Sequence, residues 1–300
     1  HPKYENVFLA TGFTGRGLMQ SPGIGRGLTE LITTGKYQTI DLSCFGLDRI
    51  FAKQKRTEPY VLWLAYKMEQ FINFFALTVY KSKINLDEKE RNELINEIVN
   101  QKKKINDKSN KTERRAWTGD TQGYEYLYLN PKFKNLFNLI EQHVLNYIKK
   151  FEFDVDKINI YFQRAWATIS NKSENISSHD HPQSHISFAY YLKKSKSDGG
   201  ITFIDNHKHN EFIKNSFGSK SLINQKVIKE NTLFNSNSVN LLPEQDDIII
   251  FPSKTLHATQ INNTNDTRIS ISADITVISK NSEKIEQLIT PIDKWKKFSI

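Results

Sequence analysis

Apolar positions follow a helical period in two segments of the chain. Between Asp87 and about Lys104, a few apolar residues recur every three or four positions in an otherwise polar stretch, which predicts an amphipathic helix. A second helix is expected from Asn130–Pro131 to about Lys150, because asparagine caps a helix start and proline suits its first turn. Its apolar positions keep the helical spacing: Leu136, Phe137, Leu139, Ile140, Val144 and Ile148.

After residue 157 the apolar period changes to the alternation that is typical of strands. Strands are expected at 158–162, 186–190, 201–204, 248–251 and 268–278, and an apolar strand from Phe71 to Tyr80 precedes the first helix of this region. Turns rich in Asn, Ser and Gly separate them. Helices followed by a run of short strands predict an α+β domain built on a double-stranded β-helix, the jelly roll, with flanking helices.

The first 56 residues differ from the rest because most of the glycines are found there. A short strand is expected at 6–11, running into the glycine-rich turn 11–17. A helix follows, with Gly35 as its expected end. We therefore expect three parts: residues 1–56, a connector at 57–70, and a domain at 71–300.

A glycine-rich turn that opens a helix can receive an anionic group on its backbone N–H donors. The segments Val7–Met19, Leu28–Ile32 and Ile40–Ser43 resemble the C-terminal end of the FAD-dependent amino-acid and amine oxidoreductases. The resemblance implies that Gly15, Arg16 and Gly17 face the flavin, with Arg16 standing where histidine is common in that family. The nucleotide-binding half of that fold is absent from these residues. FAD is therefore expected only in a longer parent protein, and the chain, which starts without Met, is interpreted as a fragment.

Composition and charge narrow the classes of function. The formal net charge is +9, but the excess of cations between Lys102 and Arg115 has no aromatic residue among it. A solvated helix end is therefore favoured over a nucleic-acid site. Cys44 is the single cysteine, which excludes an internal disulfide framework and a multi-thiolate metal site. No apolar run approaches the roughly 18 residues of a membrane helix, and no secretory signal follows the first residues. We expect a cytoplasmic protein that binds neither membrane nor nucleic acid.

Histidines are few, so their placement is informative. Of the eight in the chain, three fall between His179 and His185. In an extended segment His179 and His181 point to the same side, because side chains alternate. His257, arriving from a distant strand, would complete a three-ligand face on a metal and leave positions free for substrate or oxygen. Each histidine alone more often has a structural role, but their order and spacing together favour a metal site.

A clean alternation marks the segment from Arg268 to Asp274. Arg268 and Ser270 share its polar face with Ser272 and Asp274. An arginine inside a barrel mouth is costly without an anionic partner. A dicarboxylate ligand would supply that partner, because guanidinium pairs with carboxylate through two parallel hydrogen bonds. Ser270 faces the same way and would donate to the same carboxylate.

Together these residues resemble the 2-oxoglutarate–Fe(II) oxygenases of the jelly-roll superfamily, over about residues 71–279. The motifs are His179–Ser184, Gly199–Gly200, Phe251–His257 and Arg268–Ser272, with Trp166 before them. The resemblance implies that His179 and His257 bind Fe(II), and that Arg268 with Ser270 holds the distal carboxylate of the cosubstrate 2-oxoglutarate. Tyr190 and Trp166 are expected to line that pocket. The implied activity is oxidation of a small molecule or amino-acid-like substrate, most simply hydroxylation, with release of succinate and CO2.

Alternatives stay open at the second ligand and at the reaction. Much of the superfamily has His-x-Asp, whereas the residue two after His179 is His181. We favour His181, because Asp180 points away in an extended chain; Asp180 in a bent loop is the alternative. A cupin-like metal-binding jelly roll that does not use 2-oxoglutarate also fits the histidines, although the glutamate expected after His-x-His is missing. A further alternative is a role within a larger FAD-dependent amine oxidase fusion.

Overall fold

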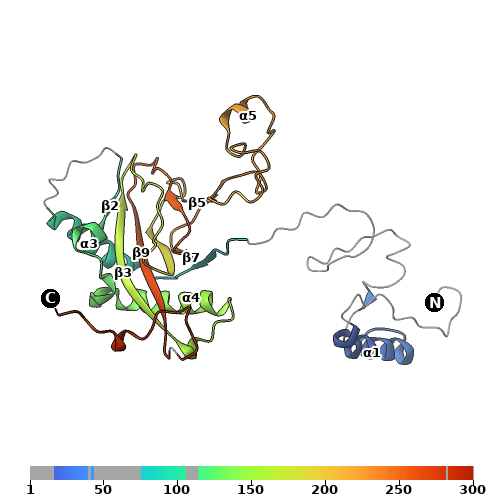
Figure 1. Ribbon diagram of the computed structural model, residues 1–300. Coiled ribbons are helices and arrows are strands. Elements are labelled where there is room, and N and C mark those ends of the chain that lie inside the picture. Colours follow the sequence, from blue (N-terminus) through green and yellow to red (C-terminus); the bar gives the residue numbers. More distant parts are fainter. Residues whose placement is uncertain (1–16, 40–41, 44–75, 106–113, 282, 300) are drawn as a thin grey trace. The chain divides into compact units, whose positions relative to one another are not determined.

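The computed structural model describes residues 17–39, 42–43, 76–105, 114–281 and 283–299. The chain divides into two units, His1–Asn73 and Phe74–Ile300, which are described separately (Figure 1). Within the described ranges, no helix combines the length and the apolar character needed to cross a membrane.

In the first unit, helix α1 (Gly17–Thr34) ends where the sequence predicts. Gly35 has a φ of 70°, and its N–H donates to the carbonyl of Leu31 at 3.0 Å. Glycine adopts this left-handed conformation at little cost, so it closes the helix. The strand expected at 6–11, together with Gly15 and Arg16, lies outside the described residues. Gly17 is the first residue of α1.

Two antiparallel sheets form the framework of the second unit (Figure 1). The larger has the order β1-β7-β4-β9-β3-β2, and the smaller the order β6-β5-β8. This is the jelly roll that the sequence predicts. The strands of the larger sheet are β1 (Tyr80–Lys83), β2 (Trp117–Thr118), β3 (Ile158–Ser170), β4 (Ile186–Lys193), β7 (Asp247–Pro252) and β9 (Arg268–Ser279). Those of the smaller sheet are β5 (Ile201–Ile204), β6 (Ser238–Leu241) and β8 (His257–Thr259).

Two helices pack on one face of the larger sheet. Helix α3 (Glu88–Lys104) begins after Asp87, whose carboxylate accepts hydrogen bonds from two backbone N–H groups of the first turn. Helix α4 (Lys134–Lys149) follows a 3-10 turn that Asn130 caps. Both predicted helices are therefore present, but the predicted cap residue Asn130 caps the preceding 3-10 turn, and α4 itself begins at Lys134. Short helices lie at α5 (Lys220–Asn224), η2 (Gly119–Gln122), η3 (Leu127–Leu129), η4 (Pro131–Phe133), η5 (Val155–Lys157) and η6 (Ile292–Lys294).

The main core lies between these helices and the larger sheet. The apolar face of α4 shares one buried cluster with Ile269, Ile271 and Ile275 of β9. The alternation predicted for β9 is therefore confirmed, and its polar positions face away from the helices. A second cluster, on the other side of the larger sheet, joins it to the smaller sheet: Tyr191, Ile201, Phe203, Ile249 and Phe251.

The expected strand from Phe71 to Tyr80 is misplaced. Its first residues, 71–75, lie outside the described residues, and 76–79 have no strand structure. The strand is Tyr80–Lys83, which pairs with β7. Lys81 and Lys83 both reach the buried carboxylate of Asp247 at this edge, at 3.0 and 3.5 Å. Pairing and these ion pairs fix the strand position, which the hydrophobicity of 71–80 does not reveal.

Candidate metal centre

Backbone pairing brings the three predicted histidines together at the edge of the smaller sheet. His179 and His257 exchange both backbone hydrogen bonds, each at 2.9 Å, and His181 donates its N–H to the carbonyl of Ser253 at 3.0 Å. Ring centroids lie 4.4 Å apart for His179 and His257, and 5.3 Å apart for His181 and His257. One ring nitrogen from each of the three lies within 4.8 Å of the other two, which is a group able to hold a metal ion.

In each ring the Nδ1 atom is already in use. A carbonyl oxygen can only accept, so the Nδ1 atoms of His179 and His257 carry the hydrogen and donate it. A neutral imidazole of this tautomer presents its Nε2 lone pair, as a metal ligand must. The acceptors, all at 2.8 Å, are Ser177 O for His179, Thr255 O for His257 and a carboxylate oxygen of Asp274 for His181.

Burial also favours the neutral state of two of these rings. It lowers the pKa of His257 to about 4 and lowers the pKa of His179 below its ordinary value. The cause is the loss of hydration, which penalises the charged imidazolium. Both rings are therefore neutral near pH 7, and metal binding there requires no deprotonation of either.

Asp274 is the main residue of this centre for which the sequence analysis predicts no role. Its fully buried carboxylate accepts hydrogen bonds from Arg164 Nε at 2.9 Å, Gln183 Nε2 at 3.0 Å and Ser184 Oγ at 3.3 Å, besides its contact with His181. Burial alone would raise its pKa, but the contacts with His181 and Arg164 outweigh burial and lower it. The carboxylate is therefore charged, and it fixes the orientation of His181. The sequence signal that could have indicated this role is the position of an acidic residue on the polar face of β9.

The three histidines line a cavity of about 690 Å³. Trp166 of β3 lines it and stacks on His181, with ring centroids 5.8 Å apart. Ser270 of β9 also faces it, as the alternation predicts. The expected pocket positions of Trp166 and Ser270 are thus found in the structure.

Two other expected positions lie differently. Tyr190 is on the opposite face of β4, where its hydroxyl donates to Asp246 at 2.9 Å within the core on the helix side. Its placement at the cavity is wrong because it shares the face of Ile186 and Phe188; the neighbouring Tyr191 lines the cavity instead. Asp180 is exposed at the cavity and is not part of the histidine group.

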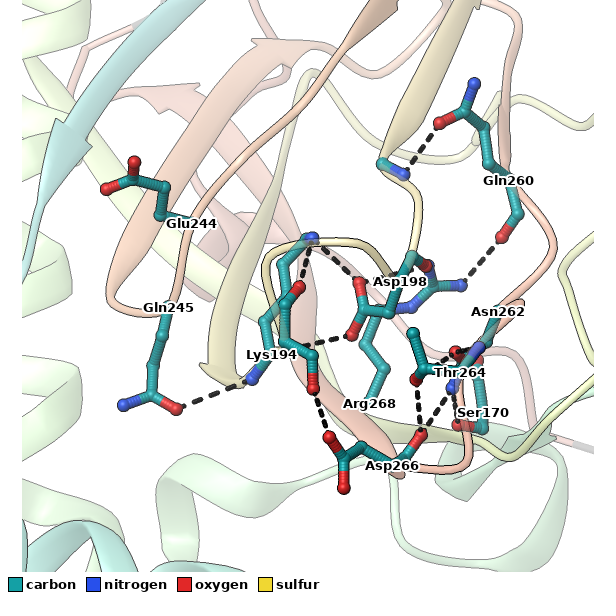
Figure 2. Close-up of polar contacts among 12 residues, drawn as sticks. Ser170, Lys194, Asp198, Glu244, Gln245, Gln260, Asn262, Thr264, Asp266 and Arg268 are labelled. Atoms are coloured by element: carbon teal, nitrogen blue, oxygen red, sulfur yellow. Dashed lines mark hydrogen bonds and ion pairs between the residues drawn. The ribbon is translucent and has the colours of Figure 1, made fainter.

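Arg268 is 3% exposed and, unlike Ser270, is not among the residues that line the cavity. Figure 2 shows its guanidinium against the turn that joins β4 to β5: Nη1 donates to the carbonyl of Asp198 at 2.7 Å, and Nη2 donates to that of Gln260 at 2.9 Å. Within the described residues, the only carboxylate oxygen within 4 Å is Asp198 Oδ1, at 3.9 Å. Arg268 thus has N–H groups left for a further anionic partner.

Comparison with known proteins separates the two units. The N-terminal segment is similar to "FAD-dependent oxidoreductase domain-containing protein 1 homolog" of Drosophila melanogaster, 48% identical over 58 residues, and to "Monomeric sarcosine oxidase" of Bacillus sp. (strain NS-129), 46% identical over 55 residues. These matches cover 19% and 18% of this chain. The chain spans only 11% and 14% of the length of those two proteins. The predicted resemblance of this segment is confirmed.

Solved structures similar to the chain include HygX from Streptomyces hygroscopicus with nickel and 2-oxoglutarate bound. It is 11% identical with a TM-score of 0.41, and the match covers 66% of this chain and 82% of HygX. The viral collagen prolyl hydroxylase vCPH from Paramecium Bursaria Chlorella virus-1 is 15% identical with a TM-score of 0.39, covering 66% of this chain and 94% of vCPH.

The segment that matches a known protein family includes the histidine centre. Residues 164–274 match the family described as "Putative 2OG-Fe(II) oxygenase". The matched range includes His179, His181, His257 and Arg268, and Fe(II) and 2-oxoglutarate are the cofactor and cosubstrate that this family implies. The second unit of the chain therefore contains a segment, residues 164–274, that is similar to the 2-oxoglutarate–Fe(II) oxygenases and includes the whole histidine centre.

Proposed function

We propose that His179, His181 and His257 hold Fe(II) through their Nε2 atoms. The observation that supports this most strongly is the hydrogen bonding of the rings: all three Nδ1 atoms have an acceptor at 2.8 Å, and one ring nitrogen of each histidine lies within 4.8 Å of the other two. Imidazole nitrogen is a suitable ligand for iron. When bound, the iron supplies the reaction of 2-oxoglutarate with O2, which yields succinate and CO2 and oxidises the substrate.

The protein's own residues position the reactants. Asp274 fixes the tautomer of His181 and supplies a negative charge behind a ligand set made of neutral rings. Trp166 and Phe251 cover His181 and His257, at centroid distances of 5.8 and 4.8 Å, which limits the access of water to the centre. Under the proposal, Arg268 and Ser270 hold the distal carboxylate of 2-oxoglutarate at the end of the cavity nearest β9.

The substrate is proposed to be amino-acid-like, with oxidation most simply a hydroxylation. Side chains of both charges line the cavity, with Arg114 and Arg115 supplying cations and Asp120 and Asp180 supplying anions. A small zwitterion would find a partner for each of its charged groups on such a surface. The cytoplasmic location expected from the sequence stays a prediction.

The test is an anaerobic titration of the full chain, first with Fe(II) and then with 2-oxoglutarate. The visible absorbance spectrum is recorded after each addition. The proposal predicts a charge-transfer band that needs both additions and is lost in His257→Ala and in His181→Ala. Asp180→Ala should keep the band. The chain offers a matched control in the exposed second His-x-His sequence, so His209→Ala should behave like the wild type. Iron binding without a band would favour the cupin-like alternative, and absence of metal binding would reject the proposal.

The cosubstrate assignment has its own variant. Arg268→Ala should raise the 2-oxoglutarate concentration needed for the band by roughly 10-fold or more, because a charge-assisted pair is lost. Iron affinity should stay close to that of the wild type, since Arg268 makes no contact with the histidines. Unchanged dependence on 2-oxoglutarate would contradict the role of Arg268.

A further inference from the structure

A buried group of charges lies behind Arg268, outside the histidine centre. Lys194 follows β4, Asp198 lies in the turn to β5, and Arg268 begins β9 (Figure 2). Their side chains are 1%, 0% and 3% exposed. Lys194 Nζ lies 2.7 Å from Asp198 Oδ1, whereas Arg268 Nη1 lies 3.9 Å from the same oxygen. Two buried cations thus face one buried carboxylate, and one positive charge has no counter-ion in this group.

The turn is built tightly against the guanidinium. The backbone carbonyl of Asp198 accepts a hydrogen bond from Arg268. The side-chain Oδ2 of Asp198 accepts a second hydrogen bond, from the N–H of Ser195, at 3.1 Å. Gly199 has a φ of 82°, and a Cβ there would lie 2.9 Å from the side chain of Gln260 and 3.5 Å from Arg268 Nη1. Glycine is required at this left-handed, crowded position. The Asp198 carboxylate therefore has a fixed place beside Arg268.

Lys194, and not Arg268, is the cation that pairs directly with the Asp198 carboxylate. Asp198 Oδ1 meets Lys194 as an ion pair, and within the described residues it accepts no hydrogen bond. Two other carboxylates of this region are already engaged: Asp266 accepts from Ser195 at 2.7 Å, and Asp247 pairs with Lys81 and Lys83. Without Lys194, the buried carboxylate of Asp198 would have Arg268 as its nearest cation among the described residues, and two opposite charges attract each other strongly at low dielectric.

We infer that Lys194 is a positioning residue for the cosubstrate: by pairing with Asp198, it leaves the charge of Arg268 available for the distal carboxylate of 2-oxoglutarate. The inference rests on the proposed function, in which Arg268 binds that carboxylate. It explains why a lysine is fully buried at this point, and it predicts that the net charge of the group, more than the presence of the lysine itself, sets cosubstrate affinity.

The experiment compares Lys194→Met with the double variant Lys194→Met/Asp198→Asn in the full, Fe(II)-loaded chain. The dissociation constant of 2-oxoglutarate is measured from the anaerobic charge-transfer band. Lys194→Met should weaken 2-oxoglutarate roughly 10-fold or more, because Asp198 then neutralises Arg268. The double variant restores one uncompensated cation, so its dissociation constant should return to within roughly 3-fold of the wild type. Iron affinity should change in neither, and Lys193→Met, at the adjacent lysine, is the matched control.

A purely structural role for Lys194 gives a different result. It predicts lower thermal stability in both variants, no selective loss of 2-oxoglutarate affinity, and no recovery in the double variant. A dissociation constant for Lys194→Met within about 2-fold of the wild type, or a double variant as weak as the single one, would overturn the inference. If Lys194→Met does not fold, Lys194→Gln carries the same expectation. Absence of the band in the wild type would instead reject the proposed function.

Discussion

The replacement Asp274→Asn tests how the second coordination sphere holds His181. Four donors converge on the two oxygens of this carboxylate: His181 Nδ1, the Arg164 guanidinium, Gln183 Nε2 and Ser184 Oγ. An amide has only one oxygen, so at least one of these donors must then face an NH2 group. The variant also removes the negative charge that stabilises the donating tautomer of His181.

The expected loss of metal affinity follows from this arrangement. Removing the carboxylate partner of a metal-bound histidine typically costs about 10- to 100-fold in metal affinity. This corresponds to about 1.4 to 2.8 kcal/mol. The fold should survive, because Arg164 is partly exposed and keeps Asp120 as a second partner at 3.7 Å.

The assay is an anaerobic calorimetric titration with Fe(II) or Co(II), which measures metal affinity. Circular dichroism checks that the variant is folded. Asp293→Asn is the control, since that carboxylate is exposed and pairs only with the adjacent Lys294 among the described residues. A folded Asp274→Asn protein that binds metal as tightly as the wild type would refute the role given to Asp274.

Two further predictions concern the framework. A Cβ on Gly200 would lie 2.1 Å from the carbonyl oxygen of Leu241, so Gly200→Ala should lower the free energy of unfolding by about 2 kcal/mol in urea denaturation. Gly25→Ala, with nothing within 4 Å of its Cβ, should not lower it; equal effects would contradict this reasoning. His143 accepts or donates a 2.8 Å hydrogen bond with Tyr80, and burial lowers its pKa. Its neutral form stabilises the fold above the ordinary histidine pKa, and this contribution is lost as pH falls. The His143→Gln variant should therefore lose less thermal stability than the wild type between about pH 7 and about pH 5. The same fall in melting temperature in both proteins over this range would contradict the prediction.

Local signals in the sequence predicted much of the framework. The helix predicted from Asp87 begins directly after this residue, and Gly35 ends α1 as predicted, because the signals at a helix end lie within one turn of it. The alternation along β9 likewise placed Ser270 at the cavity and Ile271 in the core. The same rule of alternation, applied to β4, would have chosen Tyr191 over Tyr190.

The features that the sequence did not predict depend on contacts between distant segments. Asp274 meets His181 across 93 positions of the printed sequence, and no local pattern marks which donors will surround it. The pairing of Lys194 with Asp198 is local, but its meaning comes from Arg268, which a separate strand supplies. Burial and charge balance at such places become visible only once the chain is folded.

The most direct test of the central claim is a crystal structure of the protein with Ni(II) and 2-oxoglutarate under conditions that prevent turnover. The account predicts a metal ion held by the Nε2 atoms of His179, His181 and His257, and a distal carboxylate of 2-oxoglutarate on Arg268 and Ser270. A metal ion ligated by Asp180 in place of His181, or a cosubstrate bound away from Arg268, would contradict it.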